Sequence, residues 1–295
     1  MKSIQTIIEK AIKSPTKRLI VAVAQDLYVL EAVSKAYLTL NIEVTLVGDH
    51  FEINQLLNAV SSKFDYEIID VKDKQEACLK AVKLIHSGYG HILMKGLVDT
   101  SILLKAVLNK SFGLVKDTRL SHVTLVETAN YHKLFMLSDA AMNMYPDASI
   151  KKDIVINGVK VLHKLGIKSP NVGVLAAIEK ENPKMQATLD AGILKQMNQE
   201  GEISGCVIDG PFALDNALNK EAAAHKGLTS NMAGEIDFLL MPSIDAGNIF
   251  YKALMFLANA KSASVVCGAT CPIVLTSRAD TIETKYASIA LAKLL

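Results

Sequence analysis

The stretch CPIVLTSRADTIETK (271–285) holds an apolar run that ends in two hydroxyls, a guanidinium and a carboxylate. These four side chains belong to Thr276, Ser277, Arg278 and Asp280. A guanidinium binds phosphate or carboxylate through parallel N–H donors, and neighbouring hydroxyls supply further donors. If a helix begins near residue 281, its free backbone N–H groups also favour an anion. The stretch therefore predicts a binding site for an oxyanion.

The same stretch is also typical of an ordinary helix start. Ser277 or Asp280 would then cap the helix, and Arg278 would face solvent or pair with Asp280. The residues of this stretch leave both interpretations open.

Small, polar or charged residues also follow other predicted strands, and several of them are candidates for binding a ligand. These candidates are Lys95, Gly96, Ser138, Asn143, Asp245, Gly247 and Asn248. Lys95 is suited to meet a phosphate, and Gly247 would allow a backbone to approach closely. Taken singly, each candidate also fits turn or cap chemistry, or a solvated surface lysine.

Several common catalytic and cofactor motifs are missing from the sequence. None of the seven histidines has a partner at His-Glu-x-x-His spacing, so we expect no metal site. No Gly-x-Gly-x-x-Gly or Walker loop follows a predicted strand, and no Gly-x-Ser-x-Gly elbow is present. The four cysteines show no disulfide framework, and we expect them to be buried and reduced.

Composition limits the class of protein. Hydrophobic residues make up 50% of the 295 residues and aromatic residues only 5%, which suits aliphatic parallel strands covered by helices. The net charge of +2 and the lack of a basic stripe predict no nucleic-acid partner. No apolar run approaches the roughly 18 residues that a membrane span needs, and the N-terminus does not resemble a signal peptide. We therefore expect a cytoplasmic protein with no membrane partner.

Strand-like and helix-like segments alternate along the chain, which predicts an α/β fold with mostly parallel sheets. The predicted strands are 19–24, 43–49, 66–71, 91–96, 122–128, 133–140, 172–179, 204–210, 237–243, 262–269 and 272–275. We expect 122–128 and 133–140 to pair with each other. Helices are predicted near 4–12, up to 40, and at 53–60, 78–88, 100–110 and 151–165, with Gly88 as a C-cap and Thr100 or Ser101 as an N-cap. So many strands indicate two lobes, and ligands of such sheets bind beyond the carboxyl ends of the strands.

Five segments, in order, resemble the phosphate acyltransferase family, and most closely its phosphate butyryltransferase branch. They are KGLVDTS, SDAAMN, DGPFALDNA, MPSIDAGNIFYKAL and PIVLTSRADT, of which the last two are the most specific. The resemblance implies a fold like that of isocitrate and isopropylmalate dehydrogenases, with an interlobe cleft between two α/β lobes. It places residues 1–120 plus 270–295 in the first lobe and 121–269 in the second. It also implies a homodimer or a higher homo-oligomer.

The resemblance implies a reversible reaction in which acyl-CoA and phosphate give acyl phosphate and CoA, with a butyryl or branched short-chain acyl group. Coenzyme A is then a substrate, and no tightly bound cofactor is needed. Arg278 would hold phosphate, Ser277 would hydrogen-bond the tetrahedral intermediate, and Asp280 would act as base or orienter. The substrate-binding set would be Thr276, Lys95, Gly96, Ser138, Asn143, Asp245, Gly247 and Asn248.

Two positions differ from the acetyl-specific branch, which has aspartate seven residues after the serine and asparagine at the position of Asp245. The first of these positions is Thr284 here, and the neighbouring Glu283 would face another side of a helix. Two other functions stay open on the sequence: a dehydrogenase of the same fold that acts on a hydroxy acid, and a non-catalytic sensor of CoA esters.

Overall fold

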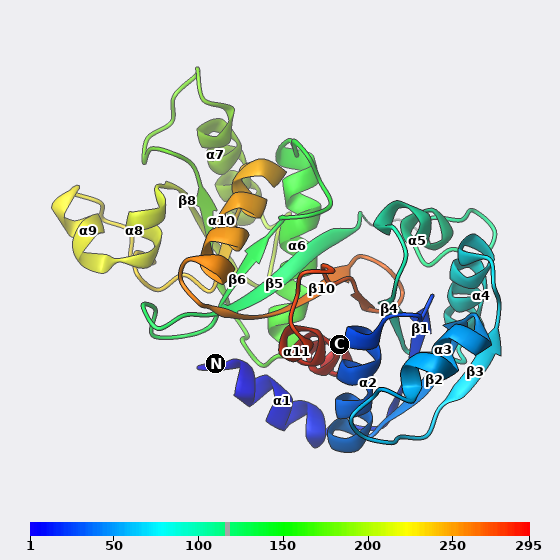
Figure 1. Cartoon of the computed structure of the whole chain (residues 1–295). Coiled ribbons are helices and arrows are strands. Elements are labelled where there is room, and N and C mark those ends of the chain that lie inside the picture. The colour runs from blue at the N-terminus through cyan, green and yellow to red at the C-terminus, as the bar shows by residue number, and fades with distance from the viewer. Residues whose placement is uncertain (116–118) are drawn as a thin grey trace. The chain divides into compact units, whose positions relative to one another are not determined.

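The computed structural model describes residues 1–115 and 119–295, and the chain forms two compact units (Figure 1). Unit 1 comprises Met1–Ile4 and Arg119–Ser262, and unit 2 comprises Gln5–Thr118 and Ala263–Leu295. Each unit is a mostly parallel sheet with helices, so the predicted α/β class is confirmed.

Unit 2 carries the candidate oxyanion site. Its elements are α1 (Ile4–Ile12), β1 (Lys17–Ala22), α2 (Leu27–Leu40), β2 (Ile42–Gly48), α3 (His50–Leu57), β3 (Glu67–Asp70), α4 (Lys74–His86), β4 (Ile92–Lys95), α5 (Thr100–Val107), most of β10 (Lys261–Cys267), β11 (Ile273–Val274) and α11 (Ile282–Leu294). The strand order is β3-β2-β1-β4-β11-β10, and only β10 and β11 pair in antiparallel fashion.

The chain reverses its direction across this sheet between β1 and β4. From β1 it proceeds outward to β2 and β3, and then returns through α4 to β4 on the other side of β1. Right-handed crossovers place α2 and α3 on one face of the sheet and α4 on the other. Helix α11 packs against α2, and α5 packs against α4, which completes both layers. Because both faces are covered, Leu19, Ile20 and Val21 of β1 are all fully buried, as a continuous apolar run predicts.

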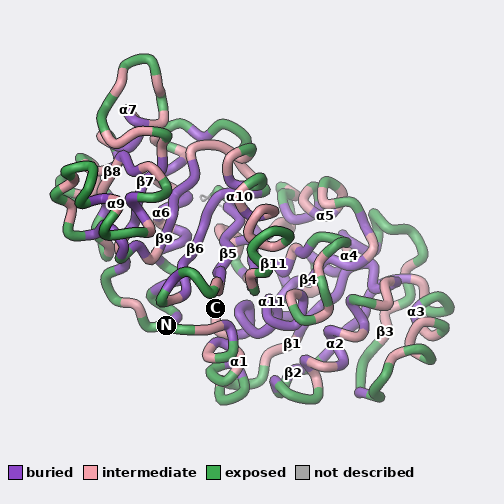
Figure 2. Tube along the Cα trace, turned by 60° about the vertical axis from the view of Figure 1, so that its left-hand side comes forward, coloured by how far each residue is buried: buried purple, intermediate pink, exposed green. Residues whose placement is uncertain are grey.

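Unit 1 holds the remaining strands and helices. They are β5 (Ser121–Glu127), β6 (Phe135–Ser138), α6 (Ala148–Lys164), β7 (Asn171–Leu175), α7 (Gln186–Gln199), β8 (Val207–Phe212), α8 (Leu214–Leu218), α9 (Lys220–His225), β9 (Phe238–Leu240) and α10 (Ile244–Phe256). The strand order is β5-β6-β9-β7-β8, with β5 and β6 antiparallel as predicted and the other pairs parallel. Figure 2 shows β5, β6 and β9 as buried strands.

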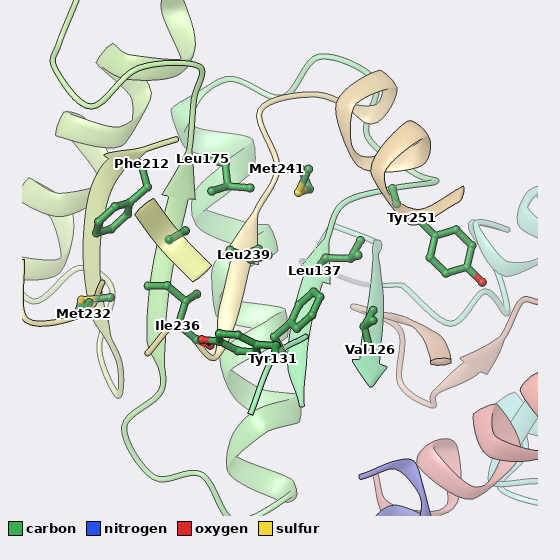
Figure 3. Packing of buried hydrophobic residues seen from close by; sticks show 13 residues of the cluster. Val126, Tyr131, Leu137, Leu175, Phe212, Met232, Ile236, Leu239, Met241 and Tyr251 are labelled. Carbon is green, nitrogen blue, oxygen red and sulfur yellow. The ribbon is translucent and has the colours of Figure 1, made fainter. Parts of the chain in front are cut away.

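The two faces of the unit 1 sheet follow the two-residue period of a strand. Leu137 pairs with Leu239, and both side chains join the core cluster that also contains Phe212 and Tyr251 (Figure 3). The alternate residue Phe238 points to the other face and closely approaches Gly158 of α6, where a Cβ atom would lie only 2.4 Å from the Phe238 ring. Helix α6 therefore packs directly onto that face of the sheet.

The helix caps differ from the predicted ones in two places. Helix α5 begins after Asp99 rather than after a Thr100 or Ser101 cap, and Asp99 makes no side-chain cap hydrogen bond. Helix α11 is capped by Thr281, whose Oγ1 accepts from the Thr284 N–H at 3.2 Å, and neither Ser277 nor Asp280 takes that role. The C-cap of α4 is Ser87, and the predicted Gly88 follows it directly with φ +78°, the left-handed conformation that glycine favours just beyond a helix end.

The described part of the chain contains no helix that is both long and apolar enough to cross a bilayer. In the same residues, no three histidine, cysteine or acidic side chains gather in a way that could hold a metal ion.

Candidate active site

The predicted site residues divide between the two units. Thr276, Ser277, Arg278, Asp280, Lys95 and Gly96 belong to unit 2, whereas Ser138, Asn143, Asp245, Gly247 and Asn248 belong to unit 1. Each group is described within its own unit.

Strand pairing brings the unit 2 residues together. Strands β4 and β11 are parallel neighbours, with Ile273 opposite Leu93 and Val274 opposite Met94. Both strands therefore end at the same edge of the sheet, so Lys95 at the end of β4 lies beside the segment that leaves β11. This edge is next to the point where the chain reverses between β1 and β4, which is where open α/β sheets bind ligands.

Lys95 is a buried cation at this edge. Its side chain is 6% exposed, and its Nζ donates to the Val98 carbonyl at 3.0 Å and to the Gly96 carbonyl at 3.3 Å. Burial lowers the pKa of Lys95, and repulsion from Arg278 and Lys285 lowers this pKa further. These three cations therefore lie within electrostatic range of one another.

Lys285 is a second buried cation of the site, and the sequence patterns did not single it out. It is 2% exposed, and its Nζ donates to the carbonyls of Ser277 at 2.7 Å and Asp280 at 3.2 Å. Burial lowers the pKa of Lys285. Within residues 1–115 and 119–295, neither Lys95 nor Lys285 forms an ion pair with a carboxylate. Buried charges are normally paired, so two unpaired ones favour an anionic ligand.

Arg278 is the exposed member of the three cations. Its Nη2 lies 3.1 Å from Asp99 Oδ1, and the two side chains are 64% and 72% exposed. Of the two alternatives predicted for an ordinary helix start, Arg278 faces solvent, and its ion-pair partner is Asp99, the residue that precedes α5, and not Asp280. An ion pair this exposed is weak, so an anion of higher charge can replace Asp99.

Ser277 and Asp280 form a closed loop with each other. Asp280 Oδ2 accepts the Ser277 N–H at 2.7 Å, and the Asp280 N–H donates to the Ser277 carbonyl at 3.2 Å. The Ser277 side chain is exposed, and Thr276 before it is buried. The loop leads to the Thr281 cap, so the first N–H groups of α11 lie next to it. These contacts fit the role of an orienter for Asp280.

Thr284 differs from the acetyl branch and Glu283 lies beside it, and the side chains of both have hydrogen-bond partners outside the Ser277–Asp280 loop. The Thr284 hydroxyl accepts from the Thr281 hydroxyl at 3.1 Å. Glu283 accepts from Lys35 Nζ at 2.7 Å and so faces α2. Glu283 therefore points to another side of α11, as the helical spacing predicts.

Gly96 has a structural reason for lacking a side chain. A Cβ atom there would lie 2.0 Å from the Val23 carbonyl oxygen, and the Gly96 N–H donates to the Ala22 carbonyl at 2.8 Å. The glycine thus lets the chain after β4 run against the end of β1, which places Lys95 at the edge.

In unit 1, Ser138 and Asn143 hold a loop in place. Ser138 is fully buried, and its hydroxyl donates to the His122 carbonyl at 2.7 Å. Asn143 Nδ2 donates to Asp139 Oδ2 at 2.6 Å and to the Leu120 carbonyl at 2.9 Å. Asp139 also accepts two backbone N–H groups of the same loop. The Ser138 hydroxyl and the Asn143 side-chain NH2 group are thus already engaged.

The start of α10 packs against this loop. A Cβ atom on Gly247 would lie 2.3 Å from the Asp139 carbonyl oxygen, so only glycine fits there. Asn248 Nδ2 donates to the Ala140 carbonyl at 3.2 Å. Asp245 is exposed and accepts from the Tyr145 hydroxyl at 3.0 Å. Asp245 and Asn248 are the two members of the unit 1 group that are exposed.

A cavity of about 360 Å³ lies at the end of β8, where the segment DGPFALDNA begins. Asp209 there accepts from Lys195 at 2.7 Å and from the Ser230 hydroxyl at 2.6 Å. Glu179 accepts from Lys226 at 2.8 Å. Because its lysine and carboxylates are paired, this cavity offers less to an anion than the edge formed by Lys95, Arg278 and Lys285.

The cysteines are unsuited to act as nucleophiles. All four are free thiols, with Cys78 and Cys271 buried and Cys206 and Cys267 half-buried, so the prediction that all are buried is only partly correct. Burial raises the pKa of Cys78 and Cys206 to about 11 and the pKa of Cys267 and Cys271 to about 12. Thiols with such pKa values carry little thiolate at neutral pH.

Known proteins are similar to this chain in sequence and in fold over nearly its whole length. The family "Phosphate acetyl/butaryl transferase" matches residues 67–293. A phosphate butyryltransferase of Clostridium acetobutylicum is 46% identical over 100% of this chain and 98% of its own length. One from Clostridium beijerinckii is 44% identical over 99% and 97%.

Solved structures agree with this assignment. A branched-chain phosphotransacylase from Enterococcus faecalis superimposes with a TM-score of 0.82 and is 30% identical, over 94% of this chain and 98% of its own. A 4-hydroxythreonine-4-phosphate dehydrogenase from Klebsiella pneumoniae, 11% identical over 94% of this chain and 98% of its own, has a TM-score of 0.58 and shares the fold alone. The match across more than half of the chain, together with relatives above 40% identity, shows that the chain belongs to the phosphate acetyl/butaryl transferase family.

Proposed function

We propose that this protein is an acyltransferase that moves a butyryl or branched short-chain acyl group reversibly between CoA and phosphate. The observation that carries the proposal is the group of three cations at one sheet edge, Lys95, Arg278 and Lys285, two of which are buried and form no ion pair with any carboxylate that the structure describes. Both phosphate and acyl phosphate are anions that need such a site. We infer from family membership that the acyl group is carried on the other side of the reaction as a CoA thioester.

In the forward direction, a phosphate oxygen attacks the thioester carbonyl carbon. The new C–O bond gives a tetrahedral intermediate. When this intermediate collapses, the C–S bond breaks, its electron pair leaves with sulfur, and the sulfur takes up the proton that the attacking hydrogen phosphate gives up, so that CoA leaves as the thiol. We assign Arg278 and Lys95 to hold the phosphate oxygens. We assign the Ser277 hydroxyl and the first N–H groups of α11 to stabilise the oxyanion of the tetrahedral intermediate.

We assign Asp280 as the residue that orients Ser277, because its carboxylate already accepts the Ser277 N–H. Thr276 completes this side of the site as a buried hydroxyl next to the loop. In unit 1, Asp245 and Asn248 stay in the proposal as substrate contacts, since both are exposed. Ser138, Asn143, Gly96 and Gly247 are better explained as supports of the surrounding backbone.

The acyl preference is supported by the names of relatives. Two relatives at 44% and 46% identity are phosphate butyryltransferases, and the Enterococcus faecalis protein is a branched-chain phosphotransacylase. The dehydrogenase alternative has only a fold likeness at 11% identity behind it, so we do not propose that activity.

The remaining parts of the proposal concern cofactors, assembly and location. CoA and phosphate enter as substrates, no tightly bound cofactor is required, and no membrane or nucleic-acid partner is proposed. An exposed apolar stripe on and just after α10, with Ile249 70%, Phe256 70% and Leu257 87% exposed, favours a homodimer. Four free cysteines suit the cytoplasm.

The test is thiol release from butyryl-CoA, isobutyryl-CoA and acetyl-CoA, each with and without phosphate. We expect release that depends on phosphate and is faster with the four-carbon acyl groups. Faster release from acetyl-CoA would overturn the acyl preference while keeping the reaction. No phosphate-dependent release with any of the three thioesters would overturn the reaction and favour a non-catalytic sensor.

We also expect that replacing the carboxylate partner of Arg278 improves phosphate binding. In Asp99→Asn, the Arg278 guanidinium no longer has to exchange the Asp99 carboxylate for phosphate. The KM for phosphate should therefore fall by about twofold to fivefold, which corresponds to the free energy of an exposed ion pair. The KM for butyryl-CoA serves as the internal control and should stay the same. An increase in the phosphate KM would show that Asp99 helps to place Arg278 instead.

A further inference from the structure

Lys285 occupies an unusual place for a lysine. It lies four residues after the Thr281 cap of α11 and is 2% exposed. A cation near a helix N-terminus is disfavoured by the helix dipole, and burial adds a further penalty. An apolar residue would be better tolerated there on stability grounds, so the ammonium needs a reason of another kind.

The contacts of the ammonium supply that reason. Side chains of a helix lean toward its N-terminus, so the Lys285 Nζ reaches back past the Thr281 cap. There it donates to the Ser277 carbonyl at 2.7 Å and to the Asp280 carbonyl at 3.2 Å. These are the first and last residues of the loop that carries Arg278. One ammonium thus ties both ends of this loop to the rigid start of α11.

A second buried lysine on the same helix provides a comparison. Lys293 is 1% exposed, and its Nζ donates to the carbonyls of Ala11 at 2.8 Å and Ser14 at 3.0 Å, at the end of α1. Both lysines are buried and bind two carbonyls. The carbonyls that Lys285 binds belong to the Ser277–Asp280 loop, whereas those that Lys293 binds lie at the end of α1. Lys293 therefore controls for the general effect of removing a buried ammonium from α11.

We infer that Lys285 is a positioning residue, which fixes the Ser277–Asp280 backbone so that Arg278 is held at the phosphate, while the Ser277 hydroxyl and the first N–H groups of α11 meet the oxyanion of the tetrahedral intermediate. The inference rests on the proposed function for its kinetic readout. It adds a residue outside the Ser-Arg-Ala-Asp motif that acts on phosphate through the loop and not through contact with the acyl group.

The kinetic test compares Lys285→Met with Lys293→Met, since methionine keeps most of the apolar stem. In Lys285→Met we expect the KM for phosphate to rise about tenfold to a hundredfold, the scale of losing hydrogen bonds from a charged donor. The KM for butyryl-CoA should change by less than about twofold, because the loop meets the thioester oxygen only after attack has turned it into an oxyanion, so that this contact affects kcat and not ground-state binding of the thioester. Lys293→Met should leave both KM values close to those of the wild type.

A double variant separates positioning from a direct effect of the Lys285 charge. If Lys285 acts through the loop that holds Arg278, then kcat/KM for phosphate in the double variant Arg278→Ala with Lys285→Met should be little lower than in Arg278→Ala alone. Multiplicative losses would show that Lys285 acts on phosphate independently of Arg278 and would overturn the positioning role.

Inorganic phosphate binding gives a readout that does not need turnover. Phosphate should raise the melting temperature of the wild type and of Lys293→Met, and this shift should largely vanish in Lys285→Met. If the wild type releases no thiol, the proposed function fails, but this comparison still tests Lys285. If the wild type is active and Lys285→Met keeps its phosphate shift and phosphate KM, the inference alone fails.

A second substitution, Lys285→Gln, keeps the inference testable if Lys285→Met does not fold. Lys285→Gln keeps an N–H donor for one carbonyl but removes the charge, and it replaces Lys285→Met if the latter shows no cooperative melting. A selective rise in phosphate KM in the folded variant supports the inference. An equal rise in both KM values would assign Lys285 a merely structural role.

Discussion

Arg278→Ala should lower kcat/KM for phosphate by about a hundredfold to a thousandfold, the range measured when a donor to a developing anion is removed. The reason is that Arg278 is the exposed guanidinium beside the two buried lysines, and its planar fork of N–H donors matches the oxygens of phosphate. Its present partner Asp99 is exposed, so the loss of this ion pair should cost less than about 1 kcal/mol in the free energy of unfolding. Steady-state kinetics and urea denaturation measure the two quantities.

Arg18→Ala is the matched control for this experiment. Arg18 is also paired with one carboxylate, since its Nε donates to Glu43 Oε2 at 2.8 Å. It lies at the start of β1, at the edge of the same sheet that is opposite the carboxyl ends of β4 and β11. We expect Arg18→Ala to keep wild-type kinetics. Full activity in Arg278→Ala, or an equal loss in both variants, would contradict the role given to Arg278.

The fold was predictable where one physical effect dominated. The run at residues 19–24 is apolar without alternation, which favours a strand covered on both faces, and β1 is buried in that way. The same reasoning predicted the sheet edge that carries Lys95, because parallel strands end together. Local pattern and tertiary structure agree at these positions.

Helix caps were less predictable because several residues compete for the same role. Ser277, Asp280 and Thr281 can all accept an N–H, and sequence spacing does not rank them. The structure selects Thr281, because the Asp280 carboxylate is already used on the Ser277 N–H. Which cap forms thus depends on the loop geometry and not on residue type.

Lys285 and the partner of Arg278 could not be predicted from spacing at all. Asp99 is 179 positions from Arg278 in the chain, and only the pairing of β4 with β11 brings them together. Lys285 stands in a helix with other charged residues, a pattern that usually indicates a solvated face. Its burial follows from the carbonyls of the loop before α11, which sequence patterns do not place.

Lys95→Met should separate activity from stability. We expect kcat/KM for phosphate to fall about a hundredfold or more, since a buried cation that faces an anion contributes strongly when its partner binds. Two opposing effects act on the free energy of unfolding. Two carbonyls lose a donor, which costs about 1–3 kcal/mol. Against this, the substitution removes a buried charge that forms no ion pair with a carboxylate in residues 1–115 and 119–295, which stabilises the protein by about 1–4 kcal/mol. The net change should stay within about 2 kcal/mol.

Urea denaturation and phosphate kinetics on the same preparation of Lys95→Met show whether Lys95 serves the fold or the binding of phosphate. A large loss of stability with an unchanged phosphate KM would make Lys95 a purely structural residue that holds the Val98 and Gly96 carbonyls. A loss of phosphate binding in a protein of near wild-type stability would show that the buried charge is kept for the ligand and not for the fold.

The pH dependence gives an independent check on Lys95. Burial and repulsion from Arg278 and Lys285 lower its pKa, so its ammonium loses the proton at a lower pH than an ordinary lysine. Only the charged form attracts phosphate, and the KM for phosphate should therefore rise at a lower pH than the titration of an ordinary lysine would give. Asp26 and Asp99 oppose this shift, while Lys285 titrates in the same direction, so the rise should be smaller in Lys95→Met without vanishing. An identical rise in the wild type and in Lys95→Met would show that Lys95 does not carry the charge that phosphate meets.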